Sequence, residues 1–396
     1  MIRAIFVAHT AAPSGAELAT SRLLSALRNV PGERSIEPSV IYTEDGPMVD
    51  TMRSQGITTH LLVNAFDSRS VTIQGSGWLR RLAGAAALIR IGWDLGATVR
   101  EHGADVLVAG STKALIMSAV AARRARVPLI WHVHDRITAK YFGTTLAFLL
   151  RTLGKMAANG YIANSRSTES SLGRWRRRGI VAYPGLDVTV DTEHAPQRPP
   201  SETVIAVVGR LTPWKGQDVF LRALSRTTVR PHRAYLVGGT FFGEEPFRAE
   251  LEELASELQL PVTFTGHIDD PTDILSMADI LVHCSVIAEP FGQVVVEGLH
   301  AGCAVIATRP GGPAETIESG VHGLLVDAGD TDQLTAALDL LIADRDLRIA
   351  LAQAGKVRAR RFDIADSAQA VAPYLSDIVA RRCRNTPTTS VEKRSV

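Results

Sequence analysis

The amino-acid sequence predicts an α/β protein with two doubly wound parallel sheets that face each other across a cleft. Short continuous runs of Val, Ile and Leu alternate with amphipathic stretches along the chain, which is the pattern of buried parallel strands covered by helices. The length of 396 residues suits two domains of ordinary size. A polar, proline-rich stretch at 191–202 separates two series of apolar runs and is expected to be the linker.

The first series of strands is expected in an N-terminal domain that spans residues 1–190. Helical periodicity fills the gaps between its apolar runs, for example in "GAELATSRLLSALRNV". The strands of this domain are expected near 2–9, 39–44, 59–64, 105–110, 129–133, 160–164 and 180–183.

The second series is expected in a C-terminal domain that spans residues 203–365. A helix at 366–384 is expected to pack back on the N-terminal domain, and the polar tail at 385–396 is expected to be flexible. The strands of the C-terminal domain are expected near 203–209, 234–238, 262–265, 280–284, 304–308 and 323–326.

The composition favours a globular protein of a reducing, cytoplasmic compartment. The chain is 45% hydrophobic and 21% charged, which suffices for ordinary globular cores. Its three cysteines are odd in number, and Cys284 and Cys303 sit in apolar runs, so free thiols are the simplest interpretation. The apolar start is too short for the core of a signal peptide. The apolar stretch 84–99 contains Arg90 and Asp94 and falls short of a membrane span.

Residues that directly follow the expected strands are the candidates for a site, because open parallel sheets bind ligands at the carboxyl ends of their strands. Gly15 in "HTAAPSGAEL" precedes a helix whose free N–H groups can bind an anion, although a plain turn glycine explains it equally well. In "IWHVHDR", His132 is expected in the core, whereas His134 and Asp135 are candidates for the cleft. The two histidines lack a third ligand for a metal site.

Two further strand ends carry groups suited to a nucleotide. In "VVGRLTPWKG", Gly209 allows a tight turn, and Arg210 and Lys215 suit a diphosphate, although a solvated loop is the alternative. In "FTGHIDDP", backbone groups of 266–268 could contact a flat base, although a turn with Asp270 capping the next helix is favoured by the residues alone. Glu315 in "RPGGPAETI" is explained as a complement to a helix dipole.

The stretch "EPFGQVVVEG" contains two glutamates eight positions apart. An acid at the position of Glu289, at the mouth of a helix, is favoured by the dipole. Glu297 lies in an otherwise apolar run, so we expect it to be partly buried, which is costly without partners. Ligand hydroxyl groups would be suitable partners. Eight residues of helical rise correspond to about 12 Å.

Together these motifs resemble glycosyltransferase family 4, a family of retaining enzymes with the GT-B architecture of two Rossmann-like domains. The resemblance is strongest over about 203–327, through "VGRLTPWKG", "GHIDD", "ADILVHCS", "EPFGQVVVEGLHAGCAVIAT", "GGPAETI" and "GVHGLLV". The first half matches more loosely, through "SGAE", "HVHD", "IANS" and "VAYPGLD". One departure is Ser14, which stands where the family commonly has a second glycine before the helix.

The resemblance implies a role for each matching residue. His134, Glu289, Arg210 and Lys215 are the expected catalytic set: His134 and Glu289 lie beside the transferred sugar, and the two cations grip the diphosphate. Glu297 is expected to hold the ribose hydroxyls. The expected set for donor sugar and nucleotide is Gly15, Gly209, Arg210, Lys215, Gly266, His267, Ile268, Glu289, Phe291, Gly292 and Glu297.

The expected reaction is transfer of a sugar from a nucleotide diphosphate sugar, UDP before GDP, to an acceptor that the sequence does not identify. Negative charge grows on the departing diphosphate, and fixed cations stabilise it most in the transition state. We therefore expect no metal and no cofactor. The one Asp-x-Asp, Asp344 to Asp346, is most simply a turn. A nucleotide-sugar epimerase of the same fold and a non-catalytic nucleotide-sugar-binding protein remain the alternatives.

Charge is distributed unevenly and bears on the acceptor. Residues 1–190 contain 23 Lys and Arg against 13 Asp and Glu, whereas 191–396 contain 20 against 28. No nucleic-acid recognition motif accompanies the basic half. The basic half contains arginines close to tryptophans and, near 146–156, apolar residues at helical spacing. These features favour peripheral contact with the inner face of a membrane and a lipid-linked or otherwise anionic acceptor. Alternatively, the apolar residues near 146–156 belong to the ordinary core. The residues concerned are Trp78, Arg80, Arg81, Leu146, Leu149, Leu150, Leu153, Met156, Arg174, Trp175, Arg176, Arg177 and Arg178.

Overall fold

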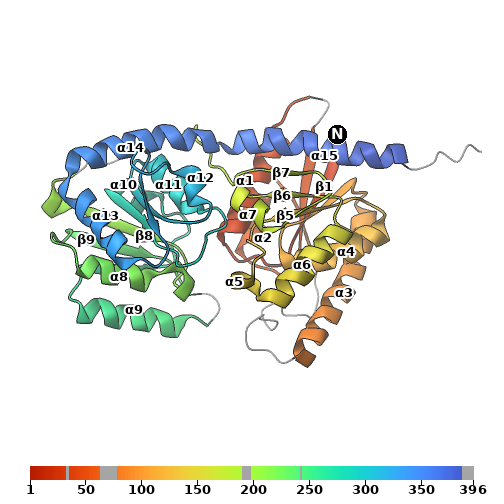
Figure 1. The fold of residues 1–396 in the computed structure, drawn as a ribbon. Coiled ribbons are helices and arrows are strands. Elements are labelled where there is room, and N and C mark those ends of the chain that lie inside the picture. The colour runs from red at the N-terminus through yellow and green to blue at the C-terminus, as the bar shows by residue number, and fades with distance from the viewer. Residues whose placement is uncertain (33–34, 63–77, 190–197, 241–242, 386–396) are drawn as a thin grey trace, which may run out of the picture.

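The computed structural model describes residues 1–32, 35–62, 78–189, 198–240 and 243–385. It contains two α/β domains that lie side by side, spanned along one side by the last two long helices (Figure 1). Most of the expected linker and nearly all of the expected flexible tail fall outside the described residues.

The N-terminal domain is built on a seven-stranded sheet in which every described pairing is parallel. The strand order is β3-β2-β1-β4-β5-β6-β7. The order therefore reverses direction between β1 and β4, which is where open sheets of this kind bind ligands. The strands are β1 (Ile2–Ala8), β2 (Ile36–Tyr42), β3 (Thr58–Leu61), β4 (Val106–Ala109), β5 (Leu129–Val133), β6 (Gly160–Ala163) and β7 (Gly179–Val181).

Helices cover both faces of this sheet and explain why its strands are apolar on both sides. One core contains side chains of α3, α4 and α6, including Leu95, Leu115 and Leu150. The core on the opposite face contains side chains of α1 and α2, including Leu24 and Met52. The helices are α1 (Gly15–Arg28), α2 (Pro47–Ser54), α3 (Trp78–Glu101), α4 (Thr112–Ala125), α5 (Ala139–Phe142), α6 (Thr144–Ala157) and α7 (Arg166–Ser171).

The C-terminal domain has a six-stranded parallel sheet of the same kind, in the order β10-β9-β8-β11-β12-β13. Its switch point lies between β8 and β11. The strands are β8 (Val204–Val208), β9 (Arg233–Val237), β10 (Val262–Gly266), β11 (Ile280–His283), β12 (Ala304–Arg309) and β13 (Leu324–Asp327).

Two apolar cores also flank the second sheet. Side chains of α8, α9 and α13 pack on one face and those of α10 and α11 on the other. The helices are α8 (Gln217–Ser225), α9 (Glu245–Glu257), α10 (Thr272–Met277), α11 (Gln293–Ala301), α12 (Pro313–Thr316), α13 (Thr331–Ala343) and α14 (Arg345–Ala359), with short 3-10 helices at Pro200–Glu202, Pro213–Lys215 and Arg360–Phe362.

The last helix, α15 (Ile364–Asn385), returns from the C-terminal to the N-terminal domain (Figure 1). The chain crosses where Leu186 N donates to Phe362 O and Ile364 N donates to Leu186 O, both at 2.9 Å. Beyond this crossing, Ala368, Val371 and Leu375 of α15 are buried in the same core as α1. The apolar face of α15 thus completes the N-terminal domain.

The fold class predicted from the sequence is confirmed. A strand lies at each of the thirteen expected places, and the largest differences are that β2 begins at Ile36 rather than at 39 and that β3 ends at Leu61 rather than at 64. The continuous apolar runs were reliable because strands covered on both faces need apolar residues at every position.

Candidate active site

Three of the candidate residues follow strands that flank the two switch points. Gly15 comes after β1, and Arg210 and Glu289 come after β8 and β11, the two strands at the switch point of the second sheet. The switch points therefore bring residues from both domains toward the boundary between them.

Glu289 lies at the centre of a buried polar cluster. One oxygen of its carboxylate, Oε2, lies 2.9 Å from Lys215 Nζ, 3.2 Å from His283 Nε2 and 2.8 Å from Ser285 Oγ. Thr308 Oγ1 in turn donates to the carbonyl oxygen of Ser285 at 2.9 Å. Burial alone would raise the pKa of the Glu289 carboxyl, but the Lys215 ammonium and the His283 contact outweigh it and hold the pKa well below its usual range. The carboxylate is therefore ionised at neutral pH.

The turn that carries Lys215 is shaped by a glycine. Gly216 has φ +72°, and a Cβ there would lie 2.2 Å from the carbonyl oxygen of Cys284. Only glycine fits such a position without strain. The turn places Lys215 Nζ 4.4 Å from the centre of the Trp214 ring as well as on Glu289. The predicted catalytic lysine and glutamate are thus brought into direct contact.

The N-termini of α1 and α11 approach each other from opposite domains. A Cβ built on Gly15 would lie 3.8 Å from Gln293 Oε1, and Gln293 is the first residue of α11. Ser14 is the N-cap of α1 and donates its hydroxyl to the Glu17 carboxylate. Helix N-termini carry unsatisfied N–H groups and partial positive charge, so their meeting creates a place where an anion is favoured.

Glu297 is partly buried as expected, and protein side chains already supply partners for its carboxylate. Its Oε1 accepts from Arg22 of α1 at 3.1 Å and from Gln293 Nε2 at 2.9 Å. The ion pair between Arg22 and Glu297 joins the two domains. The expectation that one helix spans both glutamates was wrong. Helix α11 begins at Gln293, and Glu289 lies in the loop before it.

The residues between the two glutamates shape the backbone. The Phe291 ring is buried, with its centre 5.6 Å from that of Tyr183 and 5.9 Å from that of Phe362. Gly292 is the N-cap of α11 with φ +83°. Gly312 N donates to Glu289 O at 2.9 Å, which ties this loop to the glycine pair after β12. Any contact of Phe291 with a sugar would therefore come from its backbone.

The remaining candidates lie at different depths. Gly209 follows β8 and its N–H donates to Val237 O, and Arg210 Nε lies 3.4 Å from Glu244 Oε2. The turn Gly266–Ile268 follows β10, which β9 and β8 separate from β11, so it lies at the edge of the sheet.

That turn is also more exposed than the glutamate cluster. His267 is exposed and its Nε2 lies 3.1 Å from Asp269 Oδ1. Asp270 accepts from the backbone N–H of Thr272 at 3.0 Å, so the local turn interpretation of this aspartate holds.

His134 is more buried than a cleft residue was expected to be. It is 9% exposed, and its ring centre lies 4.0 Å from that of His132, which is buried as expected. Burial lowers the pKa of His134 to about 4, so its ring is neutral at pH 7. Its Nε2 has no hydrogen-bond partner among the described residues.

Several polar residues of the site were missed from the sequence. His283 is the last residue of β11 and Ser285 follows it, so both fit the rule of polar groups at strand ends that selected the other candidates. Arg22, in contrast, carries no local signal, because its partner lies 275 positions away. The described residues contain no group of three or more His, Cys, Asp and Glu that could hold a metal ion. Asp344 caps α14 by accepting from Leu347 N at 2.9 Å, as a turn residue would.

Two Rossmann-like parallel-sheet domains that meet at their switch points, with a partly buried Lys–Glu pair beside two helix N-termini, have the GT-B architecture. Family models match both halves: residues 14–185 match the glycosyl transferase 4-like domain and residues 190–358 match glycosyl transferases group 1. The chain belongs to the GT-B glycosyltransferases of the GT4 type, so the family resemblance of its motifs is confirmed.

Known relatives are similar over different spans. A D-inositol 3-phosphate glycosyltransferase of Corynebacterium kroppenstedtii is 35% identical over 226 residues, which are 52% of this chain and 49% of that protein. The chain thus spans about half the length of this relative. The lipopolysaccharide core biosynthesis glycosyltransferase LpsE of Rhizobium meliloti is 29% identical over 316 residues, 74% of this chain and 87% of that protein. The crystal structure of Anabaena Alr3699/HepE in complex with UDP and glucose has a TM-score of 0.79 and 27% identity, covering 95% of this chain and 100% of that one.

Proposed function

We propose that this chain transfers a sugar from a nucleotide diphosphate sugar to an acceptor hydroxyl with retention of configuration, and that the donor is a UDP-sugar before a GDP-sugar. The observation that carries the proposal is the meeting of the α1 and α11 N-termini beside Lys215 and Glu289. Such a place suits a diphosphate. The neighbour from Anabaena is known in complex with UDP and glucose and with UDP-glucose, which favours UDP.

The cations of the site act on the leaving group. As the bond between sugar and diphosphate breaks, the departing oxygen gains negative charge, and Arg210, Lys215 and the two helix N-termini stabilise that charge. They do so without a metal, so turnover should survive EDTA. Loss of turnover on chelation that magnesium or manganese restores would contradict this part of the proposal. The configuration of the product at its anomeric carbon, observed by NMR, tests retention.

Glu297 serves the ribose. When nucleotide binds, ribose hydroxyls replace or share the contacts that Arg22 and Gln293 now make with this carboxylate. We expect Glu297→Ala to weaken UDP and UDP-glucose equally, by about 10- to 100-fold, because hydrogen bonds to a charged acceptor are worth about 1.5–3 kcal/mol. Calorimetry measures both affinities. Glu250→Ala, on the exposed surface of α9, is the matched control. Unchanged affinity for UDP in Glu297→Ala would overturn the ribose role.

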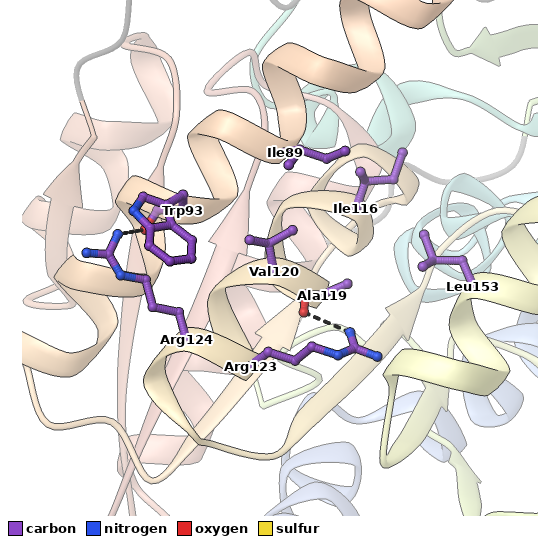
Figure 2. Close-up of a pocket in the computed structure, with 8 residues that line it drawn as sticks. All are labelled: Ile89, Trp93, Ile116, Ala119, Val120, Arg123, Arg124 and Leu153. Atoms are coloured by element: carbon purple, nitrogen blue, oxygen red, sulfur yellow. Dashed lines mark hydrogen bonds between the residues drawn. The ribbon is translucent and has the colours of Figure 1, made fainter.

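The acceptor is proposed to be presented at a membrane surface, through the face formed by α3, α4 and α6. Ile89 and Trp93 of α3 and Phe148, Leu149 and Met156 of α6 are each more than half exposed. A groove of about 540 Å³ lies on the same face (Figure 2). It is lined by Ile89, Trp93, Ile116, Ala119, Val120, Arg123, Arg124 and Leu153.

Basic residues accompany this apolar face. Arg124 lies 4.3 Å from the centre of the Trp93 ring and bonds to its backbone oxygen (Figure 2). Arg123 also lines the groove, and its Nη1 donates to Ala119 O at 3.1 Å (Figure 2). Arginine with exposed tryptophan and aliphatic groups is attracted to anionic headgroups. No helix among the described residues has the length and hydrophobicity needed to cross a bilayer.

The surface differs in detail from the one expected. Trp175 is not a surface anchor, because its ring packs on Trp131 and Tyr161, at centre distances of 6.3 and 5.2 Å. Leu150 is buried as core, as the alternative interpretation of α6 held. Arg174 and the three arginines at 176–178 are exposed. The side chains of Trp78, Arg80 and Arg81 lie outside the described residues.

Co-sedimentation with vesicles tests the membrane contact. The chain should bind vesicles rich in anionic lipid at low salt, and the double variant Trp93→Glu with Phe148→Glu should lose most of that binding. Val357→Glu, at an exposed apolar residue of α14 in the other domain, is the matched control. Absence of binding by the unaltered chain, or equal losses in test and control variants, would favour an acceptor in solution.

A further inference from the structure

A small cavity lies beside His134, on the face of the first sheet that α1 and α15 cover. His132 is in β5 and His134 directly follows this strand. Both reach the cavity because residues two apart along a strand point to the same side of a sheet. The volume of the cavity is about 10 Å³, which is about the room that one water molecule needs. It is lined by Ala19, Leu23, His132, His134, Ala182, Tyr183, Pro184, Ile364 and Ser367.

Each of the two histidines that line the cavity has one ring nitrogen that is buried and has no hydrogen-bond partner among the described residues. These nitrogens are Nδ1 of His132 and Nε2 of His134. The centres of the two rings lie only 4.0 Å apart, yet the two nitrogens are not bonded to each other. Because a buried polar atom without a partner is rare in a folded protein, two such atoms in one lining indicate an ordered water molecule.

Ser367 of α15 adds a third polar side chain to the lining. It is buried, and its Oγ donates to the backbone oxygen of Tyr183 at 2.6 Å. A hydroxyl group has one proton, so any further hydrogen bond of this Oγ must be one that it accepts. A buried water molecule makes about three hydrogen bonds. The two ring nitrogens and the serine oxygen supply that number.

The protons of such a water molecule link the two histidines. Burial lowers the pKa of His132 well below its usual value and that of His134 to about 4, so both rings are neutral at pH 7. A neutral imidazole has one N–H group and one bare nitrogen. One proton of the water goes to Ser367 Oγ, which leaves one proton for the two ring nitrogens. At least one of these nitrogens must therefore carry its own proton, and the tautomers of the two rings depend on each other.

Resting on the function proposed above and on the expected place of His134 beside the transferred sugar, we propose that the cavity binds one water molecule and that His132 and Ser367 are positioning residues for His134. The water bonds to Nε2 of His134 and leaves Nδ1 for the sugar. Since the hydrogen bond at one ring nitrogen sets which nitrogen carries the proton, the water holds His134 in one tautomer. Helix α15, which returns from the other domain, thus takes part in orienting this histidine.

Nitrogen-15 NMR of labelled histidine side chains reports the tautomer of His134 without any substrate. We expect one tautomer at pH 7 in the unaltered chain. In His132→Phe and in Ser367→Ala we expect both tautomers of His134, because the water loses a partner that restricts its protons. His60→Phe is the matched control for the first variant, because His60 bonds to another histidine away from the cavity. Ser376→Ala, whose hydroxyl also bonds to a backbone oxygen of α15, is the control for the second.

UDP release from UDP-glucose measures the consequence for the reaction. We expect kcat of His132→Phe to fall about 10-fold, the effect of one hydrogen bond in the transition state, while its affinity for UDP in calorimetry stays the same. His132→Asn should stay within about twofold of the unaltered chain and keep one tautomer of His134, because its amide places a polar atom near the position of Nδ1.

Distinct outcomes separate this proposal from the proposed function. An unchanged tautomer of His134 in both test variants overturns the positioning role, as do equal changes in the controls or equal losses of kcat in His132→Phe and His132→Asn. A crystal structure that resolves other buried waters but none in this cavity also overturns it. Absence of UDP and GDP binding by the unaltered chain would contradict the proposed donor instead, and the tautomer of His134 would still test the water site.

Discussion

Glu17 shows how a single buried carboxyl can make stability depend on pH. It lies in the first turn of α1 with 9% of its surface exposed. Burial raises the pKa of the carboxyl from 4.5 to about 7, because the Ser14 hydroxyl does not offset the loss of solvent. As pH rises, the carboxyl therefore loses its proton at a lower pH in the unfolded chain than in the folded chain. Stability from the neutral buried form is therefore complete below pH 4.5 and is lost as pH rises to about 7.

We expect Glu17→Gln to remove this loss. Relative to the unaltered chain, the free energy of unfolding of the variant should increase by about 3 kcal/mol between pH 4.5 and pH 8, since one pKa unit corresponds to about 1.4 kcal/mol. Urea unfolding of both proteins at several pH values measures the difference. Glu37→Gln, at an exposed position of β2, should show no such trend. A difference between Glu17→Gln and the unaltered chain that does not change with pH would contradict the assignment.

Local sequence predicted which residues lie at the site better than it predicted their partners. Glu289 and Lys215 were found because each follows an apolar strand or a glycine turn, and their meeting follows from the strand order. The Arg22–Glu297 pair was not found, because its members are far apart in the chain and meet only when the domains do. His134 follows a strand as predicted, yet it lines a small cavity together with Tyr183 and Pro184 of a distant segment, which local sequence does not encode.

At the scale of elements, the strands were predictable and the helix ends were less so. Within "DILVHC", the three consecutive residues Ile280, Leu281 and Val282 are apolar because both faces of β11 are covered. The start of α11 depended instead on Gly292, whose backbone conformation ends the loop and begins the helix at the next residue. The end of α13 depends on Arg348, which the sequence shows only as one arginine among many.

Arg348 satisfies the C-terminal carbonyl groups of α13. Its guanidinium is fully buried and donates to Leu341 O at 2.6 Å and to Ile342 O at 2.9 Å, and it also bonds to Arg198 O. We expect Arg348→Met to lower the free energy of unfolding by about 3 kcal/mol, because several buried acceptors lose a charged donor. Urea unfolding measures this loss. Arg345→Met, three positions earlier and exposed, should change stability by less than about 0.5 kcal/mol. Equal effects of the two variants would show that the hydrogen bonds of Arg348 make no net contribution to the free energy of unfolding.

At the scale of the whole molecule, the two domains are joined by more than the chain. Arg22 of α1 bonds to Glu297 of α11, and Ser165 Oγ donates to Pro290 O. Glu315 of α12 accepts from three donors of the other domain: Arg166 N at 2.9 Å, Ser167 N at 2.7 Å and Tyr183 Oη at 2.9 Å. The local explanation of Glu315 as a dipole complement to its own helix therefore misses its main contacts, which are with the start of α7.

We expect Glu315→Ala to let the domains separate in the absence of ligand. The substitution removes one carboxylate that holds three donors of the N-terminal domain, and each 1.4 kcal/mol lost from the closed arrangement changes its population about tenfold relative to an open one. Small-angle X-ray scattering should give a larger radius of gyration for the variant, and saturating UDP should reduce the difference because the proposed nucleotide site includes residues of both domains. Glu318→Ala, an exposed neighbour, is the control. Scattering of ligand-free Glu315→Ala identical to that of the control would mean that Arg22, Ser165 and α15 hold the domains together without it.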